Sequence, residues 1–229
     1  MPDYYLSYGL IILGIIITGL ASIQLHSTFS KYSKIPNARG LMGLDVARMM
    51  LEQAGINDVE ICPIGGQLTD HYSPREKKLR LSESVYDKTS LAAVGVAAHE
   101  CGHAIQHKEG YGPLKLRSVS VPLANIGSWL SWPLIVIGIG FDFMGLAEVG
   151  VFLFSFVVLF ELITLPVEFN ASKRALTVLE TGGYLSSEEL KGSRKVLTAA
   201  AMTYVAALLS TILQLLRLLL IVSGRRRRD

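Results

Sequence analysis

The segment VAAHECGHAIQH, residues 96–107, contains two histidines four positions apart, with a glutamate directly after the first. On a helix, positions i and i+4 lie on the same face one turn apart, so His99 and His103 can reach the same metal ion. Glu100 is offset from that face and is better placed to take a proton from a water molecule at the metal. This is the H-E-x-x-H arrangement, in which two imidazoles hold zinc and the glutamate is a general base for hydrolysis.

The surroundings of the motif favour a metal site over two unrelated surface histidines. The pattern fixes few residue identities, so it also arises by chance. Here it lies inside the segment 87–110, which is typical of one helix with polar capping residues at its start and Gly110 at its end. Two short strand-like segments, 59–68 and 77–82, precede this helix. The second of these strands has two interpretations: a sheet edge at which a substrate peptide can pair, or simply an ordinary strand of the sheet.

A catalytic zinc site requires a third protein ligand and keeps one position open for water. The metzincin pattern would place a glycine and a third histidine where this chain has Gln106 and Glu109, so that class is excluded. His107 lies roughly 12 Å from His99 along the helix axis, because each residue adds about 1.5 Å, and cannot bind the same ion. The third ligand must therefore come from elsewhere in the chain.

Three glutamates are candidates for the third ligand. Glu168, in LPVEFNASKRAL (165–176), follows directly on an apolar segment and is expected at the membrane surface with the histidine helix. Glu161 lies within that apolar segment on nearly the same helical face, and an intramembrane carboxylate is a functional candidate by default. Glu180 has the surroundings of a solvated helix residue. Ligand geometry favours Glu168, and the other two remain open.

Apolar segments surround the motif. Hydrophobic residues make up 50% of the 229 residues and charged residues 18%, against about a quarter charged residues in a soluble domain. The apolar residues are concentrated in four segments: 4–25, 121–141, 149–167 and 196–223. The first three are long enough to span a bilayer, the first as an uncleaved anchor. The fourth contains Arg217, and we expect it to pack partly on the catalytic domain and to lie partly in the membrane interface.

The polar segments predict orientation and partners. Twelve Lys or Arg residues lie between 31 and 118 and five between 168 and 195, which places both segments in the cytoplasm. The net charge of +3 is modest, and basic residues are not interleaved with aromatics, so we expect no nucleic-acid partner. Cys62 and Cys101 are too few for a disulfide framework, and we expect free thiols in a reducing compartment.

HECGH, followed by an apolar hairpin and EFNAS, resembles the membrane-bound gluzincins, including the HtpX-type and CAAX-prenyl-type peptidases. Over most of its length the chain is most similar to the YugP-type family of neutral zinc metallopeptidases. The resemblance implies a mainly α integral membrane protein with a small α+β zincin-like catalytic domain, in which small strands precede the HExxH helix. It also implies one catalytic Zn²⁺ ion held by His99, His103 and Glu168, with Glu100 as the base.

Further site residues are expected around these four. The chain departs from better-studied relatives at Ser172, where they have aspartate, and a side chain at this position can orient a zinc-bound histidine. Peptide hydrolysis also develops an oxyanion, which a cationic or hydroxyl side chain can stabilise. By chemistry alone the candidates are His71, Tyr72, Tyr204 and Arg194.

Five parts are expected along the chain. They are an N-terminal transmembrane anchor (1–30), a cytoplasmic zincin-like part with the HExxH helix (31–118), a transmembrane hairpin (119–167), a third-ligand helix with an Ala-rich helix (168–207), and an apolar membrane-associated helix with a basic tail (208–229).

The expected function is that of a membrane-bound zinc endopeptidase acting on membrane-associated or misfolded proteins. We expect it in the bacterial plasma membrane with its site facing the cytoplasm; the sequence does not predict an oligomeric state. The alternative is a non-catalytic membrane scaffold or assembly factor with a structural zinc, which would need Cys101 or His107 as a fourth ligand. An ion transporter fits less well, because the three firm spans carry almost no ionisable residue except Glu161.

Overall fold

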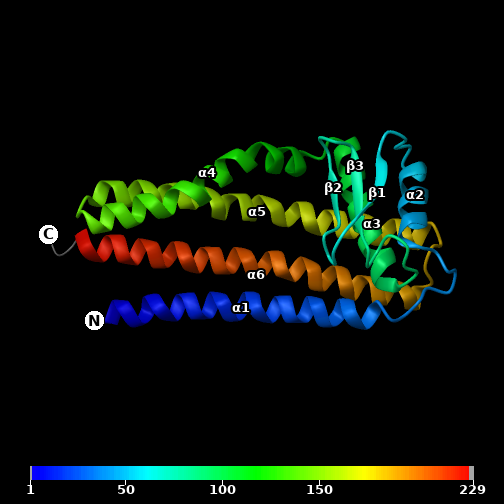
Figure 1. Ribbon diagram of the computed structural model, residues 1–229, viewed down its shortest axis with the longest axis horizontal. Helices are drawn as coiled ribbons and strands as arrows, with labels where there is room; N and C mark the ends of the chain where they lie inside the picture. Colours follow the sequence, from blue (N-terminus) through cyan, green and yellow to red (C-terminus); the bar gives the residue numbers. More distant parts are fainter. Residues whose placement is uncertain (1, 227–229) are drawn as a thin grey trace. The chain divides into compact units, whose positions relative to one another are not determined.

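The computed structural model describes residues 2–226 and contains six helices and one three-stranded sheet in this range (Figure 1). In chain order the elements are α1 (Pro2–Tyr32), α2 (Gly43–Gln53), β1 (Glu60–Ile64), β2 (His71–Ser73), β3 (Lys78–Ser82), α3 (Leu91–Lys108), α4 (Gly112–Gly140), α5 (Met144–Thr181) and α6 (Ser187–Arg226). The protein is thus mainly helical with a small α+β part, as predicted, and the short strands precede the helix that carries HECGH.

The chain forms two compact units. The apolar unit comprises Met1–Ser22, Leu116–Leu165 and Thr203–Asp229, and the sheet-containing unit comprises Ile23–Lys115 and Pro166–Met202. Each of the four long helices, α1, α4, α5 and α6, contributes residues to both units. These four helices are long and apolar enough to cross a membrane.

The last helix differs from its prediction. We expected an Ala-rich part on the catalytic domain and a short interfacial part, because a full span would carry the four terminal arginines out of the cytoplasm against the positive-inside rule and because Arg217 interrupts the apolar residues. Instead, α6 is one uninterrupted helix, and its segment Ser187–Gly224 is a fourth candidate span by length and composition. The predicted basic tail falls largely outside the residues whose side chains the structure describes.

The sheet has the order β1-β3-β2. Strand β3 pairs in parallel with β1, from Glu60↔Lys78 onward, and antiparallel with β2. The segment 77–82 is therefore not a sheet edge, and the interpretation in which a substrate pairs there is wrong. Leu79 and Leu81 of β3 are fully buried, so this strand, paired on both sides, anchors the sheet to the core.

Helix α3 is the centre of the sheet-containing unit. Ser90 caps its start by accepting a hydrogen bond from the Ala93 N–H at 3.1 Å. Its small residues let the backbones of other helices come into contact with its own. A Cβ atom on Gly102 would lie only 2.6 Å from the carbonyl oxygen of Ala171 in α5. On Gly95 it would lie 3.1 Å from Cβ of Ser193 in α6. Helix α5 can therefore run directly beside the histidines of α3.

We expect Gly102→Ala to destabilise the sheet-containing unit. The added methyl group must push α5 away from α3, and overpacking of this kind costs typically about 1–3 kcal/mol. Thermal unfolding of the detergent-solubilised protein measures the effect. Gly112→Ala is the control, because nothing lies within 4 Å of a Cβ at that position. Equal unfolding midpoints for the two variants would show that the close approach does not exist.

Candidate metal centre

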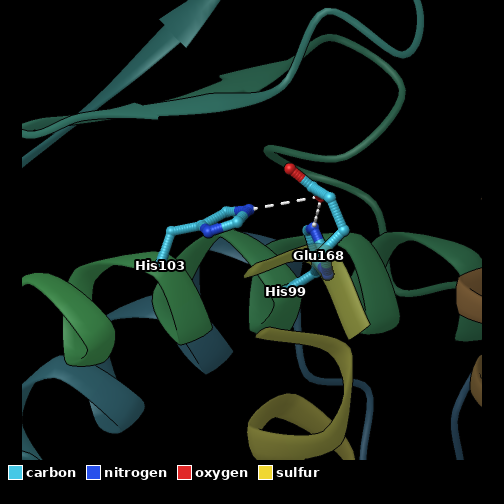
Figure 2. Close-up of side chains that lie close together, drawn as sticks. All are labelled: His99, His103 and Glu168. Carbon is cyan, nitrogen blue, oxygen red and sulfur yellow. Dashed lines mark hydrogen bonds and ion pairs between the residues drawn. The ribbon is translucent and has the colours of Figure 1, made fainter. Parts of the chain in front are cut away.

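His99, His103 and Glu168 lie together, the two histidines on α3 and the glutamate on α5 (Figure 2). Their potential ligand atoms are all within 4.8 Å of one another. Oε2 of Glu168 is 3.3 Å from Nε2 of His99 and 3.6 Å from Nε2 of His103. Of the three glutamates considered from the sequence, Glu168 is the one that the fold brings to the histidines.

This spacing fits a zinc ion. Zinc bonds of about 2.0–2.2 Å in tetrahedral geometry place neighbouring ligand atoms about 3.3–3.6 Å apart. The two measured separations, 3.3 and 3.6 Å, fall within that interval. Glu168 is also only 2% exposed, and a buried carboxylate requires cationic or hydrogen-bonding partners. Two imidazoles and one carboxylate are a donor set of hydrolytic zinc sites, with a fourth position left for water or substrate.

The second ring nitrogen of each histidine also has a partner. Nδ1 of His99 is 3.1 Å from the hydroxyl oxygen of Ser172. Nδ1 of His103 is 3.0 Å from Oε1 of Gln106. Both Nε2 atoms therefore face Glu168 and are available to a metal, and such outer hydrogen bonds orient metal-binding imidazoles.

Glu100 is buried on α3, and its carboxylate is tied to the sheet. Oε2 accepts a hydrogen bond from the backbone N–H of Tyr72, in β2, at 2.9 Å. The edge strand thus fixes the position of this carboxylate one residue from His99. The sequence suggested Tyr72 for its hydroxyl group, whereas the contact with the motif is made by its backbone.

The remaining candidates have other surroundings. His71 is exposed, with Nδ1 2.9 Å from the carbonyl oxygen of Thr69 and Nε2 3.4 Å from Arg80. Arg194 is exposed on α6, and Tyr204 belongs to the apolar unit. The oxyanion-stabilising residue stays a prediction.

Cys101 and His107, the two possible fourth ligands, are engaged elsewhere. The Cys101 thiol donates to the carbonyl oxygen of Ala47 at 3.6 Å, and complete burial strongly raises its pKa, which disfavours the thiolate that would bind zinc. Nδ1 of His107 is 2.8 Å from the Tyr72 hydroxyl oxygen. The group found among the described residues thus has three ligands, as an open catalytic site requires.

The ligand group also binds a proton well. Burial opposes the charged form of His103, but the hydrogen bonds to Glu168 and Gln106 and the negative charges of Glu100 and Glu168 together outweigh this effect and raise the pKa of the imidazole. A proton can therefore bridge the two side chains in the metal-free protein. Metal binding at Nε2 displaces that proton, so the affinity for metal falls as the solution becomes more acidic.

Two imidazoles and one carboxylate, in a chain with four membrane-length helices, are typical of membrane-bound zinc hydrolases. Residues 7–223 match the family described as "Putative neutral zinc metallopeptidase", and the chain belongs to this family. It is 45% identical over 206 residues to "Putative membrane protease YugP" of Bacillus subtilis (strain 168), which covers 90% of this chain and 92% of that protein. No solved structure matches the chain. The resemblance drawn from HECGH and EFNAS is confirmed, and zinc is the metal of the family.

We expect Glu168→Gln to weaken zinc binding strongly, because the neutral amide removes the anionic ligand. The zinc dissociation constant of the purified protein, measured by competition with a chromophoric chelator, tests this. Glu161→Gln and Glu180→Gln are the matched controls and should keep the wild-type constant. If zinc is lost in one of the controls and Glu168→Gln still binds it normally, the third ligand is the glutamate changed in that control and not Glu168.

Proposed function

We propose that this protein is a membrane-bound zinc endopeptidase in which His99, His103 and Glu168 hold the metal and Glu100 is the general base. The observation that carries the proposal is the ligand group itself, in which Glu168 lies 3.3 and 3.6 Å from the two imidazole nitrogens and a buried glutamate comes directly after the first histidine. Membership of a zinc metallopeptidase family and 45% identity to a protein described as a membrane protease support peptide bonds as the substrate.

In this proposal the metal activates the substrate and the water molecule, and Glu100 transfers the proton. When bound, zinc supplies a Lewis acid that polarises the scissile carbonyl group and makes a water molecule more acidic. One carboxylate oxygen of Glu100 is held by the Tyr72 N–H, so the other can accept the proton of the attacking water. The same oxygen then passes this proton to the nitrogen of the leaving amine. The hydrogen bond from β2 keeps the base in position through both transfers.

Membrane-associated or misfolded proteins are the proposed substrates, and the cytoplasm is the proposed side of the membrane. Glu168 follows within a few residues on the apolar part of α5, one of the four candidate spans, which supports a site near a bilayer. The basic residues of 31–118 and 168–195 favour the cytoplasmic side by the positive-inside rule. Relationship to a bacterial membrane protease supports the bacterial plasma membrane as the location.

The non-catalytic alternative lacks support from the site. A structural zinc would be closed by a fourth protein ligand. The two side chains that the sequence offered for this role, Cys101 and His107, have partners in α2 and β2 instead.

We expect Glu100→Gln to abolish cleavage while zinc remains bound. The amide keeps the size of the side chain and removes only the proton acceptor. Cleavage of a denatured test protein by zinc-loaded wild type and variant, with zinc content measured in the same preparations, is the test. Cleavage by the variant at the wild-type rate would rule out Glu100 as the base. Zinc-loaded wild type that cuts nothing across a broad substrate panel would support the scaffold alternative.

Cys62 provides a test of orientation. It is half-buried in β1, whereas Cys101 is fully buried, so in a Cys101→Ser background Cys62 is the only thiol of the chain. A membrane-impermeant maleimide should label it in inverted membrane vesicles and not in intact cells. Labelling in intact cells would place the sheet-containing unit outside the cytoplasm.

A further inference from the structure

Behind His103, on the side away from Glu168, lies a chain of hydrogen bonds that no part of the proposed mechanism uses. Gln106 is completely buried. Its Oε1 lies 3.0 Å from Nδ1 of His103, and its Nε2 donates to the carbonyl oxygen of Val167 at 2.9 Å and to Oδ1 of Asn170 at 2.9 Å. The same Oδ1 accepts a hydrogen bond from Nε of Arg174 at 2.7 Å.

The Val167 carbonyl and the Arg174 guanidinium together determine which atom donates and which accepts in each of these hydrogen bonds. A backbone carbonyl can only accept, so the amide nitrogen of Gln106 must face Val167 and its oxygen must face His103. A guanidinium can only donate, so the oxygen of Asn170 must face Arg174 and Gln106. Nδ1 of His103 is then necessarily the protonated nitrogen. Its Nε2 faces Glu168 and is the nitrogen left to bind a metal once the bridging proton is displaced.

The outer end of the chain is also held. Nη1 of Arg174 is 2.7 Å from Oε2 of Glu109, and its guanidinium carbon lies 5.8 Å from the centre of the Tyr111 ring. The ion pair, the ring contact and the bond to Asn170 together leave the guanidinium little freedom. A half-exposed ion pair contributes little to global stability, but it can fix the direction of a buried hydrogen bond.

We infer that Gln106 is a positioning residue that fixes the tautomer and the ring orientation of His103 for zinc, and that Asn170 and Arg174 hold Gln106 in this role. The inference rests on the proposed function, since it takes His103 to be a metal ligand. The two histidines differ in this respect, because the Ser172 hydroxyl beside His99 can donate or accept and does not by itself select a tautomer.

The first test compares zinc affinity in full-length, detergent-purified protein. Gln106→Leu removes the acceptor for Nδ1 of His103 and should raise the zinc dissociation constant by about 10- to 100-fold, the usual effect of removing such a partner. Gln106→Leu also removes the hydrogen bond to the Val167 carbonyl. Two variants of Asn170, the side chain that holds Gln106, are therefore compared as well. Asn170→Leu removes the oxygen that holds Gln106 and should weaken zinc binding, whereas Asn170→Asp keeps that oxygen and should restore it.

The second readout separates positioning from general stability. Co²⁺ bound in place of zinc absorbs visible light with bands that depend on ligand geometry, so Gln106→Leu and Asn170→Leu should shift these bands and Asn170→Asp should not. Thermal unfolding of the metal-free proteins provides the structural comparison. Lys173→Met, which removes an exposed cation next to Arg174, should leave both metal readouts unchanged.

The outcomes are distinct. Weaker zinc binding and altered cobalt bands in both Leu variants, with recovery in Asn170→Asp, would establish the positioning role. Wild-type affinity and wild-type bands in Asn170→Leu would overturn it, whether or not Gln106→Leu folds. A wild-type chain that binds no zinc would overturn the metal site itself and this inference with it, whereas zinc binding without cleavage would count against the proposed function alone.

Discussion

A buried carboxylate between two imidazoles is the interaction on which the sheet-containing unit depends. Glu168 is 2% exposed, and an ionised group in such a place is stable only with partners at close range. The partners are on α3, so α5 must lie against α3 at backbone distance. Glycine at 102 makes this possible, because any side chain there would meet the Ala171 carbonyl. The small residue at 102 is thus needed both for the packing of α5 on α3 and for the contact between Glu168 and the two histidines.

The two helices also support each other's ligands. Helix α5 supplies Glu168, and four residues later Ser172, which contacts the first histidine of α3. It also supplies the carbonyl oxygen and the amide that hold Gln106, through which α3 orients its own second histidine. A shift of α5 along α3 would therefore disturb all three ligands at once. Strand β2 adds an independent constraint on the Glu100 carboxylate through the Tyr72 N–H.

The sequence predicted those parts of the site that local geometry determines. The spacing of His99 and His103 is enough to place both on one helical face, and the motif around Glu168 indicated the third ligand. Helical spans followed from apolar runs of sufficient length. Contacts between distant segments could not be foreseen: that Gln106 meets α5, that a backbone amide of β2 holds Glu100, and that 77–82 is the central strand all depend on tertiary packing. The continuity of α6 was not predicted, because the four terminal arginines and Arg217 both argued against one long span.

The position of Glu168 in the chain has a consequence for biosynthesis. It follows His103 by 65 residues (168 − 103), and α4 together with the first part of α5 lies between them. A nascent chain that has just released HECGH from the ribosome holds the two histidines of the proposed site but not yet Glu168. Assembly of the metal centre must wait until the apolar hairpin has left the ribosome. The order of translation thus delays completion of the proposed site, and any hydrolysis there, until the apolar hairpin has been made.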